Sequence, residues 1–290
     1  MVASPGDRVA QRLRDLVARQ PWPDEYACLA ALALLTGDQE QGGVSRWAEL
    51  VLACASTCGG ATETAVEAAA SAALLMAALD VFDDVEDGEI APGVDPAAQL
   101  NVGTGLLLLF HQACHDSSLH ALPAPGMLVL VQAGVRACGG QHRDLCGHAG
   151  SVDIGPEEAV AIATDKSAAL VAALCRVGAL VGDAPAALLA QFAAFGYHLG
   201  MALQLANDLA AAGETAGAKT DRALRRPTLP LVYASSCPVE GEAASPHIHA
   251  EDAMMATWIV LQTHRARAHR LLARIERTHP AAACLERFLP

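Results

Sequence analysis

Basic residues are scarce in this chain and unevenly placed. No lysine or arginine occurs between Arg46 and Arg136, and only two of the 19 basic residues are lysines, Lys166 and Lys219. The formal net charge is -13. Proteins that bind nucleic acid need a basic footprint. The charge therefore predicts that nucleic acid is not a partner.

Aromatic residues are also few, at 4% of the chain, and alternating β-branched runs are scarce. The apolar content is nevertheless 53%, dominated by alanine and leucine, which favours helices around a sizeable core. We predict an all-α fold, with one domain over residues 1–290 and about ten helices around a central cavity. The expected helices are 9–17, 24–36, 45–57, 62–87, 97–115, 124–147, 156–181, 184–212, 222–235 and 251–277.

Three kinds of signal are missing. No apolar stretch reaches the ~20 uninterrupted residues of a membrane span, and the N-terminus does not resemble a secretory signal, so we expect a cytoplasmic protein. The nine cysteines include no Cys-x-x-Cys pair. His142, Cys146 and His148 lie close in sequence, but no fourth ligand has matching spacing, so we do not predict zinc.

The most informative run is Asp80-Val-Phe-Asp83-Asp84-Val-Glu-Asp87-Gly88, which ends a long apolar segment. Residues 80, 83, 84 and 87 follow the i, i+3, i+4, i+7 rule and share one helical face. Buried like charges cannot all ionise without a partner, and no basic residue is near in sequence. The spacing of Asp83, Asp84 and Asp87 thus predicts Mg²⁺, which binds one or two carboxylates together with substrate phosphate oxygens. A solvated acidic helix end is the alternative.

A second polar face occurs on an apolar segment further along the chain. Gln204, Asn207 and Asp208 are spaced i, i+3, i+4 and can reach a common point. Lys166 begins the run Lys-Ser-Ala-Ala-Leu, where an ammonium could meet phosphate as a point charge. Genomic preference for arginine codons is a sufficient alternative reason for the rarity of lysine.

Taken in order, these motifs resemble the trans-isoprenyl diphosphate synthase family, the all-helical polyprenyl synthetases. Asp83-Asp84-x-x-Asp87 is similar to the first aspartate-rich motif of the family, and Gly140-Gln141 with Asp144-Leu145 to its Gly-Gln-x-x-Asp-Leu element. Lys166-Ser167 is similar to its Lys-Thr element. Gln204 to Asp208 stand at the second aspartate-rich motif, followed by Lys219-Thr-Asp221 and Thr228-Leu-Pro230.

The resemblance implies ionisation of an allylic prenyl diphosphate by Mg²⁺ in an apolar cavity with two metal-binding walls. It implies metal ligands at Asp83, Asp84, Asp87, Asn207 and Asp208, and catalytic roles for the first three and Lys166. It implies a homodimer, as is usual in the family. The residues expected to bind substrate are Lys166, Gln204, Lys219, Arg226, Gln141, Phe82, Leu79 and Ala78.

Departures from the family pattern set the expected reaction. The Gly-Gly-Lys-Arg-x-Arg-Pro motif that holds isopentenyl diphosphate is missing before Trp47, and Glu89-Ile90 stand where the family has an arginine pair. The second motif reads Asn207-Asp208-Leu-Ala-Ala211. We therefore expect internal redirection of the cation, as in a class I terpene synthase. The alternatives are prenyl transfer to isopentenyl diphosphate, to a peptide or to an aromatic acceptor, and a non-catalytic partner subunit.

Substrate length is indicated weakly by the residues that precede Asp83. Ala78, five residues before the motif, is small where short-chain synthases usually have a bulky aromatic residue. Leu75, Met76 and Leu79 are expected to line the pocket. We expect a C15 or C20 chain, with ordinary helix packing as the alternative reason for these residues.

Overall fold

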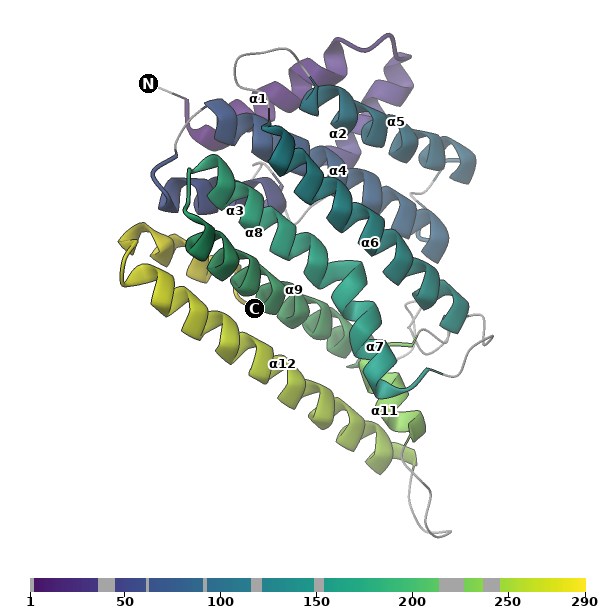
Figure 1. Ribbon diagram of the computed structural model, residues 1–290. Coiled ribbons are helices and arrows are strands. Elements are labelled where there is room, and N and C mark those ends of the chain that lie inside the picture. The colour runs from purple at the N-terminus through teal and green to yellow at the C-terminus, as the bar shows by residue number, and fades with distance from the viewer. Residues whose placement is uncertain are drawn as a thin grey trace. The chain divides into compact units, whose positions relative to one another are not determined.

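The computed structural model describes most of the chain as helices (Figure 1). The described residues are 3–35, 45–60, 63–90, 93–115, 122–148, 154–213, 227–236 and 246–290. Within these ranges there are eleven α-helices, one π-helix and one 3₁₀-helix, and no strand. The prediction of an all-α fold is confirmed.

The chain divides into two compact units. Unit 1 comprises Met1–Gly134, Leu174–Phe192 and His279–Leu285, and unit 2 comprises Val135–Ala173, Ala193–Thr278 and Glu286–Pro290. Three α-helices contribute residues to both units: α6 (Ala124–His148), α8 (Ala169–Val181) and α9 (Ala186–Gly213). The expectation of a single domain stays a prediction.

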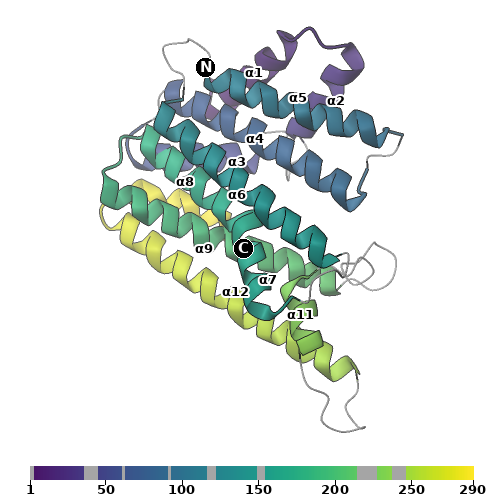
Figure 2. The same cartoon turned by 45° about the vertical axis from the view of Figure 1, so that its right-hand side comes forward.

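Unit 1 is built around one buried helix. Its other complete α-helices are α1 (Pro5–Ala18), α2 (Asp24–Leu35), α3 (Arg46–Thr57) and α5 (Pro96–Cys114). All four pack against α4 (Glu63–Asp87), and Figures 1 and 2 show α4 and α5 side by side. The α4 segment 68–78 is entirely buried because its many alanines let neighbouring helices approach closely.

Unit 2 contains a helical segment with an irregular turn. The α7 helix (Pro156–Ala163) continues through the π-helix η1 (Thr164–Ala168) into α8, so the expected helix over 156–181 is confirmed with an inserted π turn. The α11 helix (Leu229–Ser236) packs on α12 (Pro246–Glu276), as Figure 2 also shows. The 3₁₀-helix η2 (Pro280–Phe288) follows α12. The core of unit 2 consists of Ala159, Ala163, Ala168, Met201, Leu205, Leu229, Val232 and Leu261.

Helix starts were harder to place than helix interiors. The α1 helix begins at Pro5 and not at residue 9, because Ser4 and Asp7 form a reciprocal capping box. The α5 helix begins at Pro96, where the Asp95 carboxylate accepts from the amides of Ala97 and Ala98. Serine or aspartate followed directly by proline is the signal that locates both starts.

In the part of the chain that the structure describes, two helices meet the length and composition of a membrane span. They are α4 and the Ala186–Ala212 part of α9. In α4, 78% of the apolar window is buried inside the protein, which is what a core helix shows; the value for α9 is 44%. The expectation that no segment spans a membrane stays a prediction.

Candidate functional site

The carboxylate stripe lies at the C-terminal end of α4, and the helix stops abruptly after it. Gly88 has a φ of 70°, its amide donates to the Val85 carbonyl, and the Glu89 amide donates to the Asp84 carbonyl at 2.7 Å. These two bonds are the Schellman pattern, which favours glycine at the left-handed residue. The stop holds Asp87 in the last helical turn, so the stripe keeps its helical spacing through its final member.

Two carboxyl groups in this stripe, those of Asp80 and Asp84, resist ionisation. The pKa of Asp80 is raised to about 7, first by burial among protein atoms and then by the charges of Asp83 and Asp84. The pKa of Asp84 is raised to about 6 by burial, Asp83 and Glu89. Both side chains still reach solvent. A bound cation would reverse these effects because it favours the ionised carboxylates.

The donor set fits a hard divalent cation. Carboxylate oxygens are the ligands that Mg²⁺ prefers, and Mg²⁺ keeps several waters, so it needs only one or two protein ligands. Across the described ranges, no three His, Cys, Asp or Glu side chains are grouped as ligands of a single ion. Coordination by Asp83, Asp84 and Asp87 therefore stays a prediction.

The apolar residues predicted near the stripe occupy different environments. Ala78 is completely buried, whereas Leu79 is half-buried. The half-buried Phe82 lies against α5, where a Cβ on Gly103 would come within 2.8 Å of its ring. The contact with α5 gives Phe82 a packing role, and its contact with substrate stays a prediction.

A small pocket of about 90 Å³ lies between α2, α4 and α5. Its walls are mainly leucine, valine and alanine, and Asp84 and Gln99 supply polar atoms. This pocket was not anticipated, because its residues come from three segments with no common motif. They are Leu29, Leu32, Ala33, Val81, Asp84, Val94, Gln99 and Val102.

In unit 2, the backbone of η1 lies directly against α6 at Gly140. A Cβ on Gly140 would stand 2.5 Å from the Lys166 amide nitrogen and 3.0 Å from the Asp165 carbonyl carbon. No side chain larger than hydrogen fits there without a backbone shift. The glycine of the Gly-Gln element thus has a local structural reason, since it lets α6 approach the turn that carries Lys166.

Lys166 forms an ion pair with a second residue of α6. Its Nζ donates to Asp144 Oδ2 at 3.1 Å, and the two side chains are only 20% and 13% exposed. The sequence placed both residues in family motifs, and the structure brings the motifs together. Gln141, on the same helix, is half-buried. Its contact with substrate stays a prediction.

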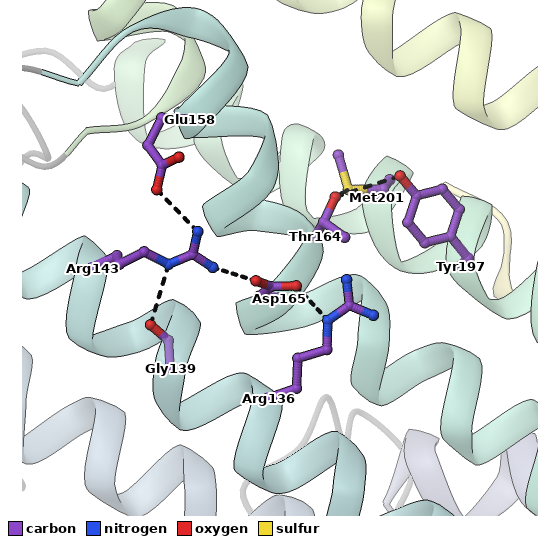
Figure 3. A network of polar contacts seen from close by, with 8 residues as sticks. All are labelled: Arg136, Gly139, Arg143, Glu158, Thr164, Asp165, Tyr197 and Met201. Atoms are coloured by element: carbon purple, nitrogen blue, oxygen red, sulfur yellow. Dashed lines mark hydrogen bonds and ion pairs between the residues drawn. The ribbon is translucent and has the colours of Figure 1, made fainter.

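The residue beside Lys166 belongs to a network that the sequence did not reveal (Figure 3). The Asp165 carboxylate accepts from Arg136 Nε and from Arg143 Nη2. Arg143 also donates to Glu158 Oε1 at 2.9 Å. Both arginines lie on α6, seven residues apart, whereas Asp165 is 29 and 22 residues away in sequence. That separation hides the pairing from any local pattern.

The second predicted polar face is partly assembled. On α9, Gln204 Nε2 donates to Asp208 Oδ1 at 2.9 Å, and Asp208 is buried. Asn207 is exposed. The i, i+4 pair is therefore present as the helical spacing requires, while metal binding by Asn207 and Asp208 stays a prediction.

Lys219, Arg226 and most of the predicted loop 238–246 lie outside the described residues.

A histidine pair on α9 and α12 was also missed. The Nδ1 atoms of His198 and His264 are 3.0 Å apart, and the Tyr197 ring lies beside both imidazoles. The pKa of His198 is lowered to about 4 by burial, then by His264, Arg267 and Arg270. Burial and Arg267 also lower the pKa of His264. Because one nitrogen must donate and the other accept, this contact is incompatible with two protonated rings.

Solved structures with a similar architecture define the fold class. A decaprenyl diphosphate synthase from Rhodobacter capsulatus has a TM-score of 0.77 at 20% identity, covering 98% of this chain and 96% of that chain. A polyprenyl synthetase from Streptomyces coelicolor has a TM-score of 0.77 at 22% identity, covering 98% and 97%. The chain therefore has the isoprenoid synthase fold.

Sequence comparison gives the family. Residues 39–257 match the family model described as polyprenyl synthetase, and the chain belongs to that family. Geranylgeranyl diphosphate synthase of Mycobacterium tuberculosis is 32% identical over 202 residues, which cover 64% of this chain and 57% of that protein. A (2E,6E)-farnesyl diphosphate synthase of Mycobacterium bovis is 29% identical over 168 residues, covering 55% and 46%. The matches span about half the length of these curated relatives.

Proposed function

We propose that this protein is a Mg²⁺-dependent prenyltransferase that acts on an allylic prenyl diphosphate, with a C15 or C20 chain favoured. The observation that carries the proposal is the stripe of Asp80, Asp83, Asp84 and Asp87, where burial and like charge raise the pKa values of two carboxyls. The names of the Mycobacterium relatives, which are diphosphate synthases, support prenyl transfer over the cyclisation that the sequence motifs alone favoured.

In this mechanism the chain supplies charge at fixed positions and excludes water. Asp83, Asp84 and Asp87 would hold Mg²⁺, which stabilises the negative charge that develops on the departing diphosphate. Lys166 would donate to a phosphate oxygen as a point charge, with Asp144 neutralising it when no anion is bound. Asn207 and Asp208 remain proposed metal ligands, and Gln204, Lys219 and Arg226 remain proposed contacts of the substrate.

Cyclisation of the cation is a second candidate, and specific residues favour it. Glu89 and Ile90 stand where elongating synthases carry an arginine pair, and Ala211 ends the second aspartate motif. A second diphosphate would find few cations in the matching segments. Transfer to a peptide or aromatic acceptor also avoids a second diphosphate, and a non-catalytic subunit of another synthase remains as a non-enzymatic reading.

The experiment that tests the proposal is an Mg²⁺-dependent assay with C10, C15 and C20 allylic diphosphates, each with and without isopentenyl diphosphate. We expect longer diphosphates that appear only when isopentenyl diphosphate is present. Hydrocarbons or alcohols formed from a single substrate would instead establish cyclisation. Absence of pyrophosphate release under all conditions would contradict both elongation and cyclisation, and would leave transfer to another acceptor or the non-catalytic subunit.

A cytoplasmic homodimer completes the proposal. Leu100 and Leu108 on α5 are 48% and 64% exposed, and Leu128 on α6 is 53% exposed. Large apolar side chains that reach solvent on neighbouring stretches of chain favour burial against a second copy. Sedimentation should show a dimer, and Leu108→Glu should shift it towards monomer.

A further inference from the structure

The π turn η1 presents two adjacent side chains of opposite charge, and both are fixed to α6. Asp165 pairs with Arg136 and Arg143, while Lys166 pairs with Asp144 at 3.1 Å. A π turn inserts one extra residue into a helix and is often found at functional sites. Asp165 is thus directly next in sequence to the lysine that is proposed to bind diphosphate.

The partners of η1 follow one face of α6. Positions 136, 140, 143 and 144 are spaced i, i+4, i+7, i+8, so the arginines flank the glycine that touches the η1 backbone. Asp165 uses both oxygens: Oδ1 accepts from Arg136 Nε and Oδ2 from Arg143 Nη2. Figure 3 shows the carboxylate between the two guanidinium groups. The side chain of Asp165 is held at two points.

One of the two arginines, Arg143, is itself held. Arg143 donates to the Glu158 carboxylate on α7 at 2.9 Å and to the Gly139 carbonyl on its own helix at 3.4 Å. Asp165 is 21% exposed, so these charge-assisted bonds are partly shielded from solvent. Through Arg143, the residue before Lys166 is therefore connected to both α6 and α7.

We propose that Asp165 is a positioning residue, which fixes the backbone of the π turn so that the Lys166 ammonium is presented to a diphosphate. The inference rests on the proposed function in one respect, the binding of diphosphate by Lys166. Arg136 and Arg143 act on that ammonium only through Asp165.

If Asp165 acted through its charge alone, its loss would have the opposite effect on polyanion binding, so the two explanations can be told apart. The cluster contains three acids, Asp144, Glu158 and Asp165, and three bases, Arg136, Arg143 and Lys166. The formal charge of this cluster is zero. Removing the negative charge of Asp165 or of Glu158 would leave the cluster at +1. If only charge mattered, Asp165→Asn and Glu158→Gln would both bind a polyanion more tightly. If position matters, Asp165→Asn binds it more weakly.

The experiment measures Mg²⁺-pyrophosphate binding to the full chain by titration calorimetry. We expect Asp165→Asn to weaken the affinity about tenfold, the cost of one charge-assisted hydrogen bond. Glu158→Gln, the matched loss of one carboxylate that leaves Asp165 in place, should bind within about twofold of wild type or more tightly. Irreversibly misfolded protein lowers the stoichiometry of binding and leaves Kd unchanged, so its presence cannot imitate the result.

A double-mutant cycle tests whether Arg136 affects binding through Asp165 or independently of it. Arg136→Gln should also weaken binding, and Arg136→Gln with Asp165→Asn should bind no worse than Asp165→Asn alone. Additive losses would overturn the claim that Arg136 acts through Asp165. If Asp165→Asn unfolds, Arg136→Gln and its conservative partner Arg136→Lys still test the proposal, with Lys expected to restore part of the affinity.

The outcomes distinguish this inference from the proposed function. Unchanged or tighter binding by Asp165→Asn, together with weaker binding by Lys166→Ala, would overturn the positioning role alone. A wild-type chain that does not bind Mg²⁺-pyrophosphate would overturn both proposals. In steady-state assays, positioning predicts a higher KM for the allylic diphosphate, whereas an irreversibly misfolded fraction would lower the apparent kcat and leave KM unchanged.

Discussion

The end of α4 and the junction of α6 with η1 are both rich in charge, yet they handle it in opposite ways. At the end of α4, Asp80 and Asp84 lie beside other carboxylates, and their pKa values rise to about 7 and about 6. At the junction, Asp165 lies between two arginines and Lys166 faces Asp144. One region has surplus negative charge, and the other is balanced.

This difference indicates what each region requires from a ligand. Clustered carboxylates are costly in the folded chain until a cation binds, so the α4 end gains from association with a metal. A balanced network gains nothing from a simple ion and instead fixes geometry, because each charged group constrains its neighbours. The end of α4 is therefore suited to binding a metal, whereas the junction of α6 with η1 is suited to holding side chains in position.

The largest expected effect is at the α4 end. Asp83→Asn removes one proposed metal ligand and should lower kcat/KM on the order of 10²- to 10³-fold, as loss of one electrostatic catalytic contact does. Steady-state assays at several Mg²⁺ concentrations measure it. Glu86→Gln, the loss of a carboxylate from the same turn but outside the stripe, is the control. Equal effects of the two variants would mean that position on the helix face does not matter.

The next effect tests the close approach at the junction. Gly140→Ala places a methyl group 2.5 Å from the Lys166 amide nitrogen, so unfolding free energy should fall by about 1–3 kcal/mol. Gly139→Ala is the matched control, since its Cβ would have no neighbour within 4 Å and alanine favours helix. Urea denaturation measures both. A stable Gly140→Ala chain would show that α6 and η1 can separate without cost.

A smaller effect is expected in the pH dependence of stability at the α4 end. Asp80 has a model-peptide pKa of 3.8 and a folded pKa of about 7. Between these values the folded chain holds more protons, so this carboxyl makes the free energy of unfolding fall as pH rises. Asp80→Asn should flatten that fall, and Mg²⁺ should oppose it in the wild type. Denaturation at pH 5 and pH 8 measures the slope.

The smallest effect has the opposite sign and comes from the histidine pair. The His198 pKa is lowered from 6.5 to about 4, so the folded chain binds fewer protons than the unfolded chain between these values. Stability contributed by this group should therefore rise with pH over that window. His198→Asn should remove part of the rise, measured by thermal unfolding at pH 4.5 and pH 7. An unchanged slope would contradict a protonation-sensitive contact.

The helical class and the acidic stripe were predictable because both depend on local periodicity. Apolar composition predicted α4, and the i, i+3, i+4, i+7 spacing placed the carboxylates on one face. The Asp165 network was not predictable, because its partners are joined only by the packing of α6 on η1. The π turn has no sequence signature of its own. The packing of the Phe82 ring on α5 was hidden for a related reason, because its position next to Asp83 in sequence does not show it.

The ion pair of Lys166 with Asp144 has a practical chemical consequence. The chain has two lysines, and Lys166 alone lies within the described residues. An amine-reactive reagent thus meets very few targets, and the extent of acylation at Lys166 reports how firmly its ammonium is engaged. Mass spectrometry of acetylated protein would measure that engagement without any turnover. Protection of the Lys166 amine by pyrophosphate would then report how much of the protein has ligand bound.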